Sequence, residues 1–148
     1  HRDLHSFPTR RSSDLVRALA DLPLGMTGHM VIEALDPDTP ATHSARVIAY
    51  LRDSLGFHGL LMTDDLSMNA LGGALADRAR RALAAGCDVV LHCSGDLAEM
   101  ESVAAASGSL TPAATARAES ALVLRRPPDA IDIAAVSAEL DRLSNAGV

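Results

Sequence analysis

The stretch Gly59-Leu60-Leu61-Met62-Thr63-Asp64-Asp65-Leu66-Ser67-Met68 decides the fold, because an apolar run ends there in two adjacent carboxylates. In parallel α/β folds, the C-terminal tip of a strand is where a side chain leaves the packed layer and meets the substrate cleft. The run Gly59–Thr63 therefore predicts a buried strand. We expect the reactive groups of the protein at Asp64 and Asp65.

Strands and helices are predicted to alternate on both sides of this stretch. The apolar run Gly25–Ile32 indicates a strand, and the turn-rich Asp36–Pro40 indicates the loop after it. Ser44 is placed to cap a helix that Gly56 closes. The other expected elements are a helix over Ala74–Ala85 ending at Gly86, a strand over Asp88–Cys93, and helices from Leu97 to about Ala106, from the cap Thr111 to about Arg125, and over about Ile133–Leu143.

Strands that are joined by helices pair in parallel, because a crossover helix returns the chain in the same direction. Three such units are too few to close a (β/α)₈ barrel, which takes roughly 250 residues. The α/β pattern therefore fits either a small doubly wound domain or the last part of a barrel. The helices that come after the third unit favour the barrel portion.

Composition excludes several classes of protein. The 148 residues are 48% hydrophobic and 22% charged, which is the balance of an ordinary globular domain. A net charge of −6, no lysine and 2% aromatic residues argue against a nucleic-acid partner. No apolar window is long enough for a membrane span and no signal-peptide core is present, so we predict a cytoplasmic location without a membrane partner. Two cysteines without CxxC spacing argue against a disulfide framework or a zinc site.

The first fifteen residues differ from the rest of the chain. They show no helical or strand period, and the string His1–Leu15 resembles translated sequencing-adapter sequence. We therefore predict that residues 1–15 are a non-native segment and exclude them from the fold.

Several motifs together resemble one family. The chain from Leu19 to Leu110 is similar to the C-terminal part of a family 3 glycoside hydrolase of the bacterial β-N-acetylhexosaminidase type. The motifs that carry the resemblance are Met26–His29, Pro40–Thr42 with Ser44, Leu55–Met68, Ala84–Asp88, and Leu91–Cys93.

The resemblance implies a fold, an activity and a domain division. The fold would be a TIM-type (β/α)₈ barrel, of which residues 16–126 hold the last three βα units, followed by a helical tail over residues 127–148. The activity would be removal of terminal β-linked N-acetylglucosamine, chiefly from peptidoglycan fragments during cell-wall recycling. The substrate would be a small carbohydrate, and the chemistry needs no cofactor and no metal.

The same resemblance assigns the site. A retaining glycosidase needs an ionised carboxylate below the anomeric carbon and a second group that protonates the leaving oxygen. The family motif places the nucleophile at Asp64. We expect Asp65 to have a supporting part, either accepting hydrogen bonds from loop amides or capping the short turn at Leu66–Asn69. If Asp64 points into the barrel mouth, Leu60 and Met62 point inward as well, while Leu61 and Thr63 face the helices.

Three histidines are candidates for functional or structural roles in addition to the two aspartates. The family pattern makes His29 a cleft-facing, substrate-binding candidate, although a structural histidine satisfied by protein partners is the alternative. We expect structural roles for His43 and His92.

The sequence also departs from the family. The acid/base histidine of the family comes after a Lys-His-Phe-Pro-Gly-His-Gly stretch, which is absent here. We therefore predict that the isolated chain is inactive. The alternatives are a small signalling or Mg²⁺-binding domain that uses the Asp64/Asp65 pair, and an inactive interaction module.

Overall fold

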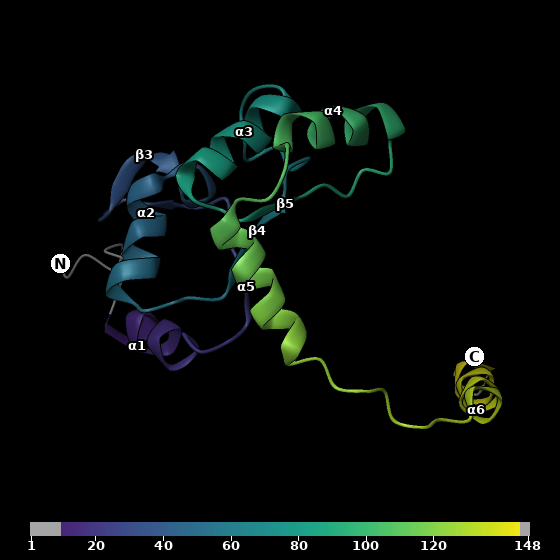
Figure 1. The fold of residues 1–148 in the computed structure, drawn as a ribbon. Coiled ribbons are helices and arrows are strands. Elements are labelled where there is room, and N and C mark those ends of the chain that lie inside the picture. The colour runs from purple at the N-terminus through teal and green to yellow at the C-terminus, as the bar shows by residue number, and fades with distance from the viewer. Residues whose placement is uncertain (1–9, 146–148) are drawn as a thin grey trace.

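A three-stranded parallel sheet forms the centre of the molecule in the computed structural model, which describes residues 10–145 (Figure 1). The strands are β1 (Leu24–Met26), β4 (Leu60–Asp65) and β5 (Val89–Leu91), in the order β1-β4-β5. Residue 24 pairs with residue 60, and residue 62 with residue 89. The predicted parallel pairing is confirmed, and it brings the carboxyl ends of all three strands to one edge.

The remaining elements cover one face of this sheet or extend from it. They are α1 (Arg10–Ala18), β2 (Val31–Ile32), β3 (Asp36–Pro40), η1 (Ala41–His43), α2 (Ala45–Ala49), η2 (Tyr50–Ser54), α3 (Leu75–Ala85), α4 (Leu97–Ser107), α5 (Pro112–Val123) and α6 (Ile133–Asn145). The helix α1 begins inside the segment that we excluded, whereas residues 1–9 and 146–148 lie outside the described residues.

The predicted strand Gly25–Ile32 is wrong in its second half. The main-sheet strand is short, and β2 pairs antiparallel with β3, in the segment that we expected to be a loop. Proline has no amide to donate, which is why Pro37 and Pro40 indicated a loop. A two-stranded ribbon tolerates them, because both of its strands are edges.

The helix boundaries agree with the predicted caps. The Ser44 hydroxyl accepts a hydrogen bond from the Val47 amide at 3.2 Å, and Thr111 caps α5 in the same way. Gly86 ends α3 in the left-handed region at φ 113°. The sequence did not predict the π-helical turn η2 after α2. The apolar residues that predicted a single helix continue through this turn to Leu55.

The core lies between the sheet and the helices. One cluster joins β4 to α2 and α3 around Leu61, and a second lies beneath α4 around Leu66. Leu61 and Thr63 are 1% and 0% exposed, whereas Leu60 and Met62 on the opposite face are half-buried. The predicted alternation along this strand is therefore confirmed, and it turns Asp64 away from the helices.

A buried ion network fixes the other end of β4. The Asp88 side chain is 4% exposed and accepts hydrogen bonds from Arg52 at 2.7 Å, from Arg117 at 2.6 Å and from the Leu61 amide at 2.9 Å. Arg52 also lies over the ring of Phe57. A buried carboxylate needs several hydrogen-bond donors. Those of Asp88 come from η2, β4 and α5, so the network joins these three elements.

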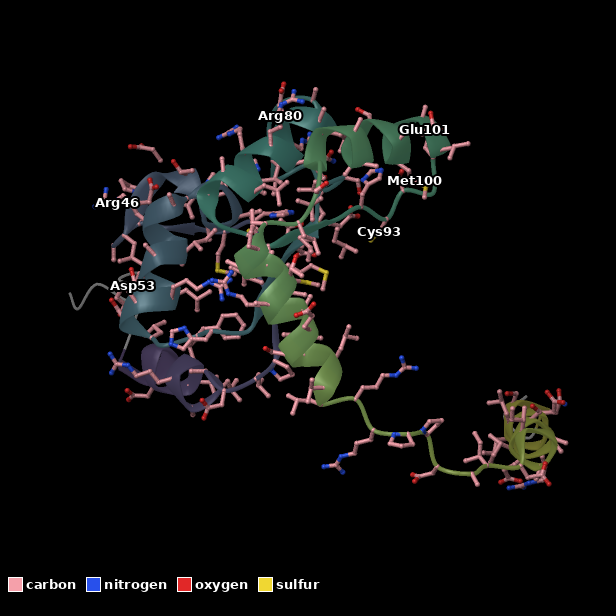
Figure 2. The ribbon with its side chains drawn as sticks, in the orientation of Figure 1. Arg46, Asp53, Arg80, Cys93, Met100 and Glu101 are labelled. Carbon is pink, nitrogen blue, oxygen red and sulfur yellow. The ribbon has the colours of Figure 1, made fainter. Side chains whose placement is uncertain are left out.

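Charged side chains cover the outer surfaces of several helices, and the described part of the C-terminal tail is exposed. Figure 2 shows Arg46, Asp53, Arg80 and Glu101 pointing outward from the helices that carry them. The helix α6 stands apart from the sheet at the end of an extended link (Figure 1), and its described side chains are exposed. Within residues 10–145, no helix has both the length and the apolarity that crossing a membrane requires.

Candidate active site

Asp64 is held at the carboxyl end of β4 by backbone pairing with the neighbouring strand. Its amide donates to the carbonyl of Thr27 at 3.1 Å, and the Thr27 amide donates to the Met62 carbonyl at 2.9 Å. The Asp64 side chain is half-buried, and its Oδ1 accepts from the amide of Asp65 at 2.8 Å. Among the described residues, no other hydrogen bond reaches this carboxylate, so Oδ2 can meet an incoming group.

Asp65 has a different environment from its neighbour. Its Oδ1 accepts from the amides of Ser67 at 2.9 Å and Cys93 at 3.1 Å, and its Oδ2 accepts from the Ser67 hydroxyl at 2.5 Å. These bonds, the hydroxyl bond first, hold the pKa of Asp65 below its ordinary value. Asp65 therefore fixes the loop to β5 and the turn after the strand.

His29 connects the end of β1 to this turn. Its Nε2 donates to the Asp65 carbonyl at 2.9 Å, and its Nδ1 lies 2.8 Å from the hydroxyl of Thr42. Thr42 is fully buried and lies 2.8 Å from the hydroxyl of Thr27. Both ring nitrogens of His29 thus have protein partners, an arrangement that orients the backbone beneath Asp64. Substrate binding by His29 stays a prediction.

Arg78 on α3 holds the loop after the strand. Its guanidinium donates to the carbonyls of Leu66 at 2.6 Å, Met68 at 3.1 Å and Gly73 at 2.9 Å. His43 Nε2 donates in turn to the Arg78 carbonyl at 3.1 Å, and burial lowers the pKa of His43. The structural role expected for His43 fits these contacts.

His92 lies on the far side of the turn, directly after β5. Its side chain is 4% exposed, and it lies between Asp65 on β4 and Glu99 on α4. No sequence pattern placed it beside Asp65, because it is the pairing of β4 with β5 that brings the two together.

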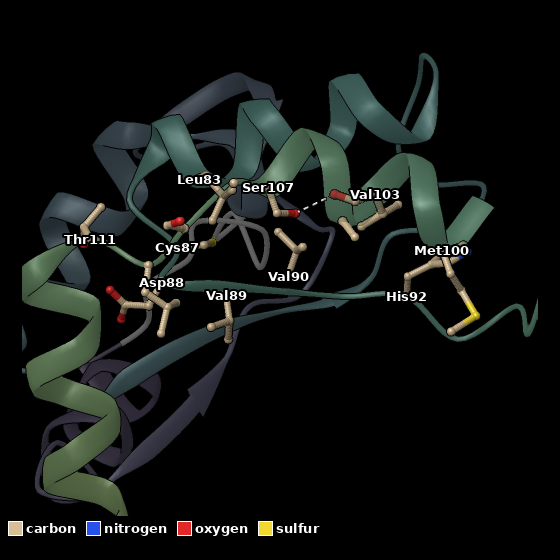
Figure 3. A pocket seen from close by; sticks show the side chains of 14 residues that line it. Leu83, Cys87, Asp88, Val89, Val90, His92, Met100, Val103, Ser107 and Thr111 are labelled. Atoms are coloured by element: carbon tan, nitrogen blue, oxygen red, sulfur yellow. Dashed lines mark hydrogen bonds between the residues drawn. The ribbon is translucent and has the colours of Figure 1, made fainter. Parts of the chain in front are cut away.

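A cavity of about 460 Å³ lies away from Asp64. Figure 3 shows it between β5 and α4, with Val90 and Val103 along its length and His92 and Met100 at one end. Asp64 is not among its lining residues. The half-buried face of Asp64, on the side of β4 opposite the helices, is the better candidate for a functional site.

The sequence pointed to the aspartates and His29, but not to all of the residues that hold them. Thr27, Thr42 and Arg78 act through contacts between residues far apart in the chain, for which a single sequence carries no signal, whereas Ser67 contacts Asp65 within the local turn. Within residues 10–145, no three side chains of the metal-binding types are gathered in one group.

Comparisons with known proteins show relatives of one kind. The chain is 45% identical over 105 residues to a β-hexosaminidase of Alkalilimnicola ehrlichii, covering 64% of this chain and 30% of that protein. It is 36% identical over 129 residues to a β-hexosaminidase of Tolumonas auensis, covering 82% of this chain and 37% of the relative. The chain thus spans about a third of the length of these relatives.

Solved structures give the same relationship. A β-N-acetylhexosaminidase from Beutenbergia cavernae superposes with a TM-score of 0.55 at 32% identity, covering 76% of this chain and 32% of that one. A family 3 β-N-acetylglucosaminidase from a Paenibacillus species gives a TM-score of 0.57 at 25% identity, covering 75% of this chain and 24% of that one. The sheet is therefore a portion of the (β/α)₈ domain of that family.

A sequence profile described as the glycosyl hydrolase family 3 N terminal domain matches residues 14–124, which is most of the chain. With a strand that presents Asp64 at its tip and a sheet that superposes on solved β-N-acetylhexosaminidases, the chain belongs to glycoside hydrolase family 3.

Proposed function

We propose that this chain carries the nucleophile of a retaining β-N-acetylhexosaminidase that hydrolyses terminal β-linked N-acetylglucosamine, and that Asp64 is this nucleophile. One observation supports the choice most strongly. Asp65 has both carboxylate oxygens engaged by Ser67 and Cys93, whereas the Asp64 carboxylate accepts from a single amide. A nucleophile needs an oxygen that is free to form a bond.

The geometry suits attack by Oδ2. The amide of Asp65 donates to Oδ1 and holds the carboxylate in a fixed orientation. Oδ2 would attack the anomeric carbon as a second group protonates the departing oxygen, and water would then hydrolyse the glycosyl ester. The second group belongs, by the family pattern, to a stretch that this sequence lacks. Asp64 therefore supplies one half of the chemistry.

The assignment of Asp64 as the nucleophile also implies a place in the barrel, a substrate and a cellular location. The described units would be the last three of the barrel, and the substrate would be a peptidoglycan fragment with N-acetylglucosamine at its non-reducing end. His29 would contact substrate through the carbon edge of its ring, since its nitrogens already have partners. A cytoplasmic location would place the enzyme where recycled cell-wall fragments arrive.

A signalling or Mg²⁺-binding role has weaker support. A pair of carboxylates that shares a phosphoryl group or a cation would point both side chains toward it. Here Asp65 bonds to the turn and to the β5 loop, so that only Asp64 faces away from the protein.

The test uses a chimeric protein in which the rest of the barrel is restored. Residues from 16 onward are joined to the preceding part of the Alkalilimnicola ehrlichii relative, and the chimera is assayed with a chromogenic β-N-acetylglucosaminide. We expect Asp64→Ala to lower kcat by about 1,000-fold or more, because no other group can form the covalent intermediate. Asp53→Ala, at an exposed carboxylate on η2, serves as the matched control. Turnover that is unchanged in Asp64→Ala would contradict the assignment.

A further inference from the structure

His92 has the one buried side-chain nitrogen without a hydrogen-bond partner among the described residues. This atom is Nδ1, and it lies 3.8 Å from Oδ1 of Asp65. Figure 3 shows His92 at the end of β5, beside Met100 of α4. A buried polar atom is normally paired, so an unpaired one that is aimed at a carboxylate calls for an explanation.

The other ring nitrogen is engaged. Nε2 lies 3.1 Å from Oε2 of Glu99 and 2.8 Å from the hydroxyl of Ser94. Glu99 is in the first turn of α4, where its amide donates to the cap Asp96. The imidazole thus lies between a carboxylate of β4 and a carboxylate of α4, with the Ser94 hydroxyl beside it.

Neither neutral form of the ring can donate to both acids. A neutral imidazole donates from one nitrogen and has a lone pair on the other, and an ionised carboxylate can only accept. With the proton on Nε2, the lone pair of Nδ1 faces Asp65. With the proton on Nδ1, the lone pair of Nε2 accepts from the Ser94 hydroxyl, but no proton is directed to Glu99. Only the imidazolium donates toward both acids.

We propose that His92 is a positioning residue: as an imidazolium it bridges Asp65 and Glu99 and thereby fixes the strand tip that presents Asp64. The inference rests on the proposed function in one respect, namely the role of Asp64. The link to that residue runs through Asp65, whose Oδ1 faces His92 and whose amide donates to Asp64 Oδ1. The titratable groups that face the ring are Asp65 from β4 and Glu99 from α4.

The same contact joins three elements. Asp65 Oδ1 also accepts from the amides of Ser67 and Cys93, so the oxygen that His92 faces already holds the β4 turn and the β5 loop together. A protonated Nδ1 of His92 would donate to this oxygen while Nε2 contacts Glu99, so the ring would connect α4 to the β4 turn and the β5 loop. Loss of the proton would release the helix from the strand tip without disturbing the backbone pairing of the sheet.

The test is a pH titration of the full 148-residue chain, labelled with ¹³C and ¹⁵N, monitored by NMR between about pH 5 and 9. It records the ring nitrogens of His92, the carboxyl carbons of Asp65 and Glu99, and the amide of Asp65. We expect the carboxyl carbons and the amide to shift with the same midpoint as the His92 ring. Both ring nitrogens should carry protons on the acidic side of that midpoint. The exposed His58 is the internal control, and its titration should leave the Asp65 signals unmoved.

The variant His92→Gln distinguishes a role of His92 in positioning Asp65 from a role in folding. We expect it to lose the pH-dependent step at the Asp65 carboxyl carbon while the amide spectrum of β4 and α3 is retained. Glu99→Gln should keep the step at Asp65 and lose the one at residue 99. The proposal is overturned if the His92 ring stays neutral over the whole pH range, if the Asp65 signals stay constant while His92 titrates, or if their step persists in His92→Gln. Because no activity is measured, these outcomes are independent of whether Asp64 proves to be the nucleophile.

Discussion

Asp64 and Asp65 have the same side chain and adjacent positions, yet their surroundings differ. Along a strand, neighbouring side chains point to opposite sides, and the turn after β4 brings the hydroxyl of Ser67 onto Asp65. The chemical difference between the two acids therefore arises from the turn after the strand, to which the Cys93 amide of the β5 loop adds one contact. Ser67 belongs to the motif that suggested the family, but its bond to Asp65 required the structure.

The pKa of Asp65 leads to a pH-dependent prediction for Ser67→Ala. Because Ser67 lowers the pKa of Asp65 in the folded state, the bond stabilises the fold above the ordinary pKa of an aspartate and is lost as the pH falls through the folded value. Urea unfolding should show a lower free energy of unfolding for Ser67→Ala at pH 7, with the difference shrinking below about pH 4. Ser102→Ala, on the exposed side of α4, is the control. A difference that grows on acidification would contradict the assigned direction.

At the scale of elements, the caps and the apolar periods were predictable and the short strands were not. Ser44, Gly86 and Thr111 mark helix ends because their chemistry is local. The hairpin of β2 and β3 was missed because its two strands are stabilised by each other and contain prolines that normally indicate a loop. The contacts of His29 and His92 were equally inaccessible, since each joins two strands or a strand and a helix.

Gly86 gives a direct test at this scale. It has φ 113°, and an added Cβ would lie 3.0 Å from Cγ2 of Ile48 in the core. Gly86→Ala should therefore lower the free energy of unfolding by about 1–2 kcal/mol, from the left-handed backbone alone. Gly72→Ala is the matched control, because an added Cβ there meets nothing within 4 Å. Equal stabilities of the two variants in thermal unfolding would refute the strain argument.

At the scale of the whole molecule, β1 and β5 are the edges of the sheet within residues 10–145, and the face that carries Leu60 and Met62 is only half-buried. Leu24 and Met26 are 52% and 53% exposed, and an apolar row of α6 that includes Ile133 and Leu140 is exposed as well. A complete barrel would pack against the first of these surfaces, and the chain spans only about a third of its relatives. The composition could not reveal this, because an apolar content of 48% is ordinary for a closed domain.

The open face predicts how the 148-residue chain behaves alone. We expect it to bind a hydrophobic dye such as anilinonaphthalene sulfonate at neutral pH. We also expect no hydrolysis of a β-N-acetylglucosaminide, because the sequence lacks the stretch that precedes the family's acid/base histidine. Fluorescence titration and a chromogenic assay measure the two properties. A compact, monodisperse chain without dye binding would contradict the open sheet.

If Asp64 is the nucleophile, it must form a covalent bond to the sugar during turnover. Incubating the active chimera with a fluorinated N-acetylglucosaminyl donor that slows the second step, and then mapping the adduct by peptide mass spectrometry, detects this bond. We expect one glycosyl group on Asp64, in the peptide that contains Gly59–Met68, and none in Asp64→Ala. An adduct on Asp65 or on another residue, in an enzyme that turns over normally, would show that Asp64 is not the nucleophile.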